Sequence, residues 1–134
     1  MPQNFTSAPE NYEIETFVSE GPNIVVTPAE HKGRGVLHSH SFYEIVYVAE
    51  GFTLHQSCGR ITMLITGDFF FVKPGEVHSY INAYQTKLYN LLFVPAALGD
   101  SFSALSALPG LDEMFSPSGE SLDPTHRLLH ASIG

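Results

Sequence analysis

Short apolar and β-prone runs recur along much of the chain, and the run over 12–19 alternates between apolar and polar residues, a pattern that predicts strands. The longest β-prone run is 37–50, which a break near Ser41 would divide, and a shorter run over 24–27 is expected to end at Pro28. Further strands are expected over 12–19, 52–56, 60–66, 68–72, 77–83 and 86–94. Glycine and proline separate these runs, so the pattern predicts an all-β sandwich or barrel.

The pattern changes after Pro95. Residues 101–108 fit a short helix that Pro109 ends, residues 111–115 fit a further helical turn, and residues 126–132 fit a terminal strand. Loops are expected over 31–35 and 116–125.

The length of 134 residues predicts one domain with a single hydrophobic core. We expect a flexible N-terminal arm over 1–11 and a domain over 12–134. The β-barrel is expected over about 12–95, and a short helical segment with a final strand over about 96–132. Ten Phe and six Tyr favour strands over helices.

The net charge of −8 argues against nucleic-acid binding by this chain itself, because such binding depends on Lys and Arg that neutralise phosphates. The single cysteine, Cys58, excludes an internal disulfide and agrees with a reducing compartment. The sequence has no apolar run of about 18 residues and no signal-peptide pattern at its start. A bacterial cytoplasmic location is therefore expected.

Candidate chemistry begins in the longest run, where His38, His40 and Glu44 share one parity. An unbroken strand would point these three side chains to the same side, amid apolar neighbours such as Phe42 and Val46. Two imidazoles and a carboxylate rarely enter an apolar interior without a partner. The pattern therefore predicts a polar site on one face of this strand, among apolar side chains.

A second stretch, 67–82, supplies a Gly-Asp turn, a hydrophobic strand, a Pro74-Gly75 turn and His78. Together the two stretches resemble the two motifs of the cupin family, with Lys73 at the usual proline of the second motif and with no glycine in register before the first. The resemblance implies a double-stranded β-helix, or jelly-roll barrel. It also implies that the matching residues line its interior and often bind one divalent metal; these are His38, His40, Glu44 and His78.

Two interpretations of these four residues stay open. One is a single metal ion held by three imidazoles and a carboxylate, with Zn, Ni, Fe, Mn and Co all compatible. The other is a metal-free polar floor that hydrogen-bonds a sugar or a similar ligand.

Four further residues are candidates for ligand binding, each with an ordinary structural alternative. Tyr80 and Asn82 share the parity of His78 and would face the same cavity, although a buried tyrosine is also a common core residue. Phe42 fits barrel core as well as a stacking surface for a sugar. Arg34 would reach a ligand's carboxylate or hydroxyls, or would be a solvated loop residue.

A narrower resemblance covers about residues 20–130. The stretches H-S-H-S-F-Y-E-I-V at 38–46, G-D-F-F-F-V-K-P-G-E-V-H-S-Y at 67–80 and L-P-G at 108–110 are similar to the arabinose/rhamnose-type (AraC family) transcription regulators. In that family an N-terminal cupin domain senses a small molecule and helps to dimerise, and a separate C-terminal helix-turn-helix domain binds DNA. The resemblance implies that this chain is an isolated sensor domain for a small effector, expected to be a sugar, and a homodimer.

Two other functions stay open. A small metal-dependent cupin enzyme (a dioxygenase, isomerase or decarboxylase) would use the same four candidate ligands, with an open metal position for water or dioxygen. A binding protein without a regulatory partner would differ from the sensor only in lacking a DNA-binding domain.

Overall fold

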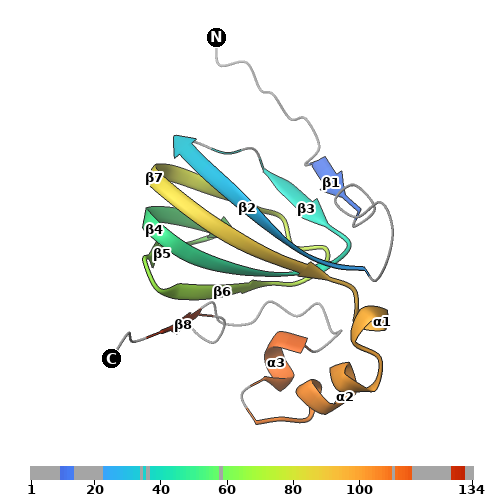
Figure 1. Ribbon diagram of the computed structural model, residues 1–134. Helices are drawn as coiled ribbons and strands as arrows, with labels where there is room; N and C mark the ends of the chain where they lie inside the picture. Colours follow the sequence, from blue (N-terminus) through green and yellow to red (C-terminus); the bar gives the residue numbers. More distant parts are fainter. Residues whose placement is uncertain are drawn as a thin grey trace.

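The computed structural model describes residues 10–13, 23–33, 35, 37–57, 59–109, 111–115 and 128–131. Within these ranges the strands join into one eight-stranded sheet (Figure 1). The strands are β1 (Glu10–Tyr12), β2 (Ile24–Gly33), β3 (His38–His40), β4 (Tyr43–Ser57), β5 (Arg60–Ile65), β6 (Asp68–Val72), β7 (His78–Phe93) and β8 (Leu128–His130). Their order is β1-β3-β7-β4-β6-β8, with β2 added to β7 and β5 added to β4.

Two long antiparallel strands, β4 and β7, organise this sheet. Near one end of their ladder Glu44 pairs with Leu92, and at the other end Ser57 pairs with His78. A flat ladder would separate these ends by about 40 Å at roughly 3.3 Å per residue. The side chains of Glu44 and His78 nevertheless lie 3.7 Å apart. The sheet therefore rolls over on itself, which brings the two ends together inside the fold.

The bend is built into the middle of the ladder. The register of β4 against β7 shifts at three places between Val48 and Leu54, and each irregularity adds twist. Gly51 lies within this region with a φ of 80°. A Cβ atom there would lie 2.5 Å from the carbonyl oxygen of Tyr84, so the close approach of the two backbones requires glycine.

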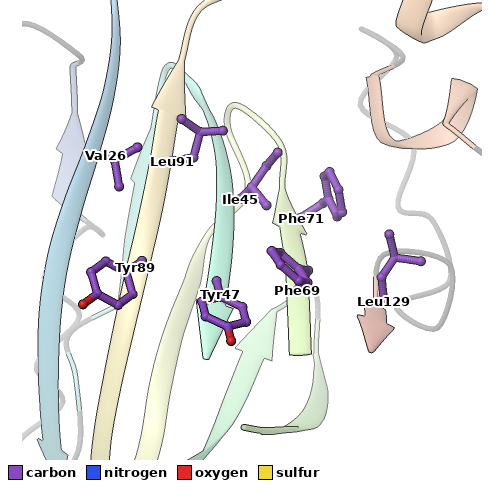
Figure 2. Close-up of a pocket in the computed structure, with 8 residues that line it drawn as sticks. All are labelled: Val26, Ile45, Tyr47, Phe69, Phe71, Tyr89, Leu91 and Leu129. Carbon is purple, nitrogen blue, oxygen red and sulfur yellow. The ribbon is translucent and has the colours of Figure 1, made fainter. Parts of the chain in front are cut away.

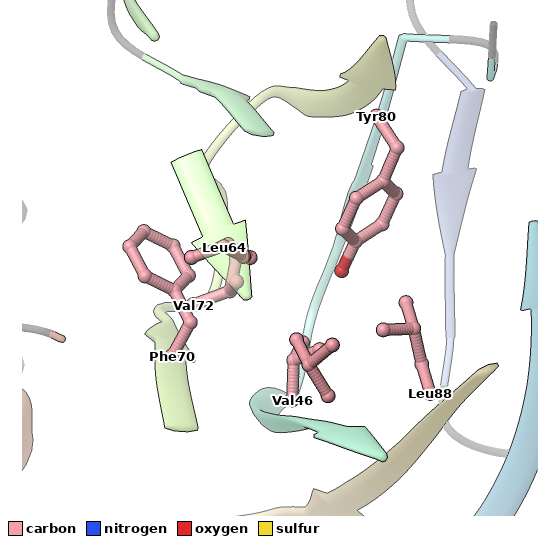
Figure 3. Close-up of a cluster of buried hydrophobic side chains, with 7 residues drawn as sticks. Val46, Leu64, Phe70, Val72, Tyr80 and Leu88 are labelled. Carbon is pink, nitrogen blue, oxygen red and sulfur yellow. The ribbon is translucent and has the colours of Figure 1, made fainter. Parts of the chain in front are cut away.

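The interior of the barrel is filled from alternate positions of β4 and its neighbours. Val46 and Val48 are fully buried, as their shared parity predicts. Figure 3 shows Tyr80 pointing into the same interior as Val46 and Leu88. The complete cluster is Val46, Val48, Leu64, Phe70, Val72, Tyr80 and Leu88.

Three short helices cover part of the other face of the sheet: α1 (Pro95–Leu98), α2 (Asp100–Ser106) and α3 (Asp112–Phe115). They gather at one end of the barrel, beyond the end of β7 (Figure 1). Met114 and Phe115 of α3 form a buried cluster with Tyr43 and Phe93, whose rings stack at a centroid distance of 5.4 Å. The helices therefore cover one end of the outer face of the sheet.

The predicted all-β jelly roll with short C-terminal helices is confirmed. The predicted strand over 68–72 coincides with β6, and the helix, the helical turn and the last strand appear as α2, α3 and β8. The break near Ser41 is also confirmed, because it separates β3 from β4. The predicted arm lies outside the described residues up to residue 9, whereas Glu10 and Asn11 belong to β1. Residues 14–20 of the predicted strand 12–19 and the loop 116–125 also lie outside the described residues.

Two predictions about β2 are wrong. The strand does not end at Pro28, and residues 31–33 of the predicted loop continue it to Gly33. Within the described residues β2 pairs only with β7, so it is an edge strand there. An edge strand tolerates proline because one side of its backbone needs no ladder donor.

Two predicted strand boundaries are also wrong. Residues 52–56 continue β4 rather than form a separate strand, and the predicted strands 77–83 and 86–94 merge into the single strand β7, His78–Phe93. Turn-like residues bend these strands without ending them: Gly51 has a φ of 80° and Gln85 a φ of 41°. Within the described residues, no helix has the length and apolar character needed to cross a membrane.

Candidate functional site

Three buried side chains from three strands converge inside the barrel. His40 ends β3, Glu44 lies near the start of β4, and His78 begins β7. Their ring nitrogens and a carboxylate oxygen all lie within 4.8 Å of one another. A buried carboxylate is costly unless a proton, a hydrogen bond or a cation compensates its charge. Within the described residues this cluster is the strongest candidate for a functional site.

The ring of His40 has one defined proton position. Its Nδ1 lies 2.7 Å from the carbonyl oxygen of Phe42, and because a carbonyl only accepts, Nδ1 carries a hydrogen and donates it. Nε2 of the same ring lies 3.1 Å from Oε2 of Glu44. A bare ring nitrogen and a carboxylate oxygen repel each other, so this contact requires a second proton or a cation. The ring is oriented as a metal ligand would be, with its other nitrogen held by the backbone.

His78 is oriented by another histidine. Its Nδ1 lies 2.8 Å from Nε2 of His55, and its Nε2 faces Oε2 of Glu44 at 3.7 Å. The sequence motifs do not include His55, and it has the opposite parity from Val46. The register shifts in the middle of β4 turn it into the interior, where it is 1% exposed. No count of alternation along the sequence predicts this inward position.

His38, the fourth predicted ligand, lies beside the cluster. Its backbone pairs with that of His78 across β3 and β7, and the two ring centroids are 4.3 Å apart. The convergent set of donor atoms in the described residues consists of His40, Glu44 and His78. Of the four predicted ligands, three are therefore convergent donors, and the ring of the fourth packs against His78 at a tilt of 53°.

The turn between β6 and β7 fixes His78 relative to His40. The backbone N–H of Gly75 donates to the carbonyl oxygen of His40 at 2.8 Å, and Gly75 has a φ of 81°. Lys73, which stands at the usual proline of the motif, is buried. The Pro74-Gly75 turn thus links the two motifs through the backbone, and this link supports the approach of the two imidazoles.

The structure places two of the four predicted ligand-binding residues beside the cluster. Tyr80 is 3% exposed, and burial, followed by the negative charge of Glu44, raises the pKa of its phenol well above the usual value. Phe42 is buried and its ring stacks on that of His40 at 4.3 Å, while it also packs against Leu92. Arg34 lies outside the described residues, and Asn82 is described only as a backbone position in β7.

A separate groove of about 430 Å³ lies on the outer face of the sheet (Figure 2). Of its side chains, only those of Tyr47 and Tyr89 carry a polar atom. The complete lining is Val26, Ile45, Tyr47, Phe69, Phe71, Tyr89, Leu91 and Leu129. A ligand rich in hydroxyls needs several fixed polar partners, which this groove does not offer. The polar interior is therefore the better candidate for such a ligand.

The interior donor set fits a divalent transition metal. Two imidazole nitrogens and one carboxylate oxygen are ligands that Zn, Fe, Mn, Co and Ni accept, and they leave coordination positions open. The backbone carbonyl of Phe42 and the ring of His55 hold the remaining nitrogens of the two histidines. Such outer contacts commonly orient metal-binding histidines.

Comparison with known proteins gives one family. The profile of the AraC-like ligand binding domain matches residues 23–133 of the chain. The match includes both motifs, the three convergent donors and all three helices.

Curated relatives cover part of the same region. The HTH-type transcriptional activator RhaR of Klebsiella pneumoniae is 34% identical over 74 residues, which are 55% of this chain and 26% of the relative. The protein of the same name from Enterobacter sp. (strain 638) is 27% identical over 101 residues, which are 75% of this chain and 36% of the relative. The chain thus matches about a quarter to a third of the length of these relatives.

Solved structures support the fold. A cupin 2 conserved barrel domain protein from Salinispora arenicola aligns with a TM-score of 0.51 at 22% identity, covering 63% of this chain and 72% of that protein. A cupin-2 domain containing protein from Shewanella frigidimarina aligns with a TM-score of 0.50 at 19% identity, covering 54% and 72%. At these identities the likeness concerns the barrel alone.

Proposed function

Because this chain belongs to the family of AraC-like ligand binding domains, we propose that it is the sensor of a bacterial transcription regulator and that its effector is a sugar. The observation that best supports this proposal is the buried convergence of His40, Glu44 and His78 in a barrel of that family. A buried carboxylate is costly unless its charge is compensated. A bound small molecule with several hydroxyls would add hydrogen bonds to the one between His40 and Glu44.

The interior offers both acceptors and donors to such a ligand. The carboxylate of Glu44 accepts hydrogen bonds, and the phenol of Tyr80, whose pKa burial raises further, is a hydrogen-bond donor. The stacked pair of His40 and Phe42 offers an aromatic surface beside them. Arg34 and Asn82 complete the proposed ligand-binding set.

We further propose that the cluster holds one divalent metal ion. His40, Glu44 and His78 would be its ligands, with His38 as the fourth. Such an ion would supply a positive charge able to bind a ligand's hydroxyl or carboxylate oxygen. Metal analysis of protein purified without a metal column tests this: about one equivalent is expected in the wild type and a loss in His40→Ala or His78→Ala.

The effector is tested by a thermal-shift titration of the wild-type domain with pentoses, hexoses and 6-deoxyhexoses. A true effector raises the melting temperature progressively, because binding to the native state stabilises it by about 2.7 kcal/mol at a hundred times Kd. Tyr80→Phe should weaken the shift, whereas Tyr84→Phe, at an exposed position, should not. A full panel in which no sugar changes the melting temperature contradicts the sugar proposal.

The proposal also extends to the part of the regulator that lies outside this chain. The matched relatives are named HTH-type transcriptional activators and are about three to four times longer than the matched region. We propose that the natural protein acts in the cytoplasm as a homodimer and binds DNA through a further domain. The test is the mass of the native gene product, detected with an antibody to this domain: a product near the 14.7 kDa of this chain contradicts the proposal.

A metal-dependent cupin enzyme is the second candidate, because two imidazoles and a carboxylate with open positions also suit oxygen chemistry. Assays with Fe(II), dioxygen and candidate substrates separate the two functions. Turnover that requires His40 and His78 would replace the sensor proposal. Binding without turnover would support it.

A further inference from the structure

We propose that His55 is a positioning residue that fixes the tautomer of His78, an inference that rests on the proposed metal site. His55 lies outside both sequence motifs and belongs to the strand that pairs with β7 rather than to β7 itself. Its Nε2 lies 2.8 Å from Nδ1 of His78, and both side chains are buried, at 1% and 0% exposure. His78, a member of the donor cluster, is therefore held by the ring of His55, which is not a member.

A hydrogen bond between two imidazole nitrogens permits two neutral arrangements. In the first, Nδ1 of His78 carries the proton and donates to Nε2 of His55. In the second, Nε2 of His55 donates to a bare Nδ1 of His78, and the proton of His78 is then on its Nε2. Each ring carries one proton in both arrangements, so they differ only in which nitrogen of each ring is protonated.

Only the first arrangement suits metal binding. Nε2 is the nitrogen of His78 that belongs to the donor cluster. The first arrangement leaves the lone pair of this nitrogen directed toward Glu44 and His40, whereas the second places a proton on it. Without a cation, a bare Nε2 would lie 3.7 Å from the carboxylate oxygen of Glu44 and would repel it. We therefore expect the first arrangement when a metal ion is bound, because the cation then takes the place of that proton.

Packing keeps the ring of His55 in place. Its centroid lies 4.5 Å from that of Phe70 and 5.3 Å from that of Tyr80, and its backbone pairs with that of Tyr80. A ring confined in this way presents its Nε2 to His78 without a search through other rotamers. This preorganisation is the property that outer residues give to metal ligands.

Two substitutions of His55 separate the effect of losing its hydrogen-bond acceptor from the effect of changing its side-chain volume. His55→Leu removes the acceptor and keeps an apolar side chain of similar size, whereas in His55→Gln the side-chain amide oxygen replaces Nε2 as acceptor. We expect zinc affinity to fall about 10- to 100-fold in His55→Leu and to be largely restored in His55→Gln. His130→Gln is the control: His130 binds Asp68, at the far end of β6 from the residue that pairs with Glu44. Equal affinities in wild type and a folded His55→Leu overturn the proposal.

Nitrogen-15 NMR of the imidazole rings in the zinc-loaded wild type provides a second readout. We expect Nδ1 of His78 to be protonated and to show a nitrogen–nitrogen coupling across its hydrogen bond to Nε2 of His55. A zinc-loaded wild type without this coupling overturns the role of His55, and this result is available even if His55→Leu fails to fold. A wild type that does not bind zinc contradicts the metal proposal itself.

Discussion

His40 donates from Nδ1 to the carbonyl oxygen of Phe42 at 2.7 Å and thereby directs its Nε2 to Glu44 at 3.1 Å. The break between β3 and β4 makes this contact possible, because the carbonyl two residues along bends back toward the ring. The same break lets residues 40 and 44 meet, which a straight strand would place about 13 Å apart. The geometry of the break thus determines which nitrogen of His40 is available for chemistry.

The first prediction concerns Glu44. Glu44→Gln replaces a charged carboxylate by a neutral amide of the same shape, so the affinity for a divalent cation should fall at least about tenfold. Isothermal titration with zinc measures it. Glu50→Gln is the matched control, since it removes the same charge from an exposed residue of the same strand that pairs with Lys87 at 3.2 Å. Equal losses in both variants would mean that net charge, rather than coordination, determines zinc affinity.

The second prediction concerns pH. Burial holds the pKa of Tyr80 well above its usual value, so the unfolded chain releases this proton near pH 10 while the folded chain keeps it. The free energy of unfolding should therefore be unaffected by Tyr80 below about pH 10 and should fall as pH rises toward the folded pKa. Denaturant unfolding between pH 8 and 11 measures this. The decline should be shallower in Tyr80→Phe, and an unchanged slope would contradict the assignment.

The third prediction concerns the bend in β4. Gly51→Ala adds a Cβ atom 2.5 Å from the carbonyl oxygen of Tyr84, in addition to the strain of a positive φ. We expect a loss above about 2 kcal/mol, since the backbones of β4 and β7 must separate. Gly59→Ala has a similar φ of 72° but open space around its Cβ, so it should cost only about 1 kcal/mol. Chemical denaturation of both variants measures the difference, and similar losses would show that the close approach is unimportant.

The fourth prediction concerns the core. Leu88 is 1% exposed and packs in the cluster of Figure 3, so Leu88→Ala should lower the free energy of unfolding by about 2–5 kcal/mol. Leu108→Ala makes the same chemical change at an exposed position and should cost less than about 1 kcal/mol. Denaturant midpoints with unchanged slopes measure both. A small loss in Leu88→Ala would mean that the interior collapses around the missing side chain.

Local pattern was sufficient for the strands that begin and end at ordinary turns. The predicted strand 68–72 is an apolar run bounded by a Gly-Asp turn and a Pro-Gly turn, and the structure has β6 at the same residues. It was insufficient where a turn-like residue lies inside a strand. Pro28 and Gly51 each resemble an end, yet the neighbouring β7 supplies enough pairing to continue β2 and β4 past them.

The sequence by itself determined the all-β fold class through its β-prone runs, and the resemblance of its two motifs to the cupin family made His40, Glu44 and His78 candidate site residues. Only the tertiary structure decided that His55 lies beside these residues and that the ring of His38 packs at a tilt against His78 rather than joining the convergent donors. The reason is that the odd or even positions of a strand point to one face of the sheet only as far as the next register shift. The bends in β4 and β7 reverse the inward face of β4 and roll a ladder of about 40 Å into a contact of 3.7 Å between Glu44 and His78.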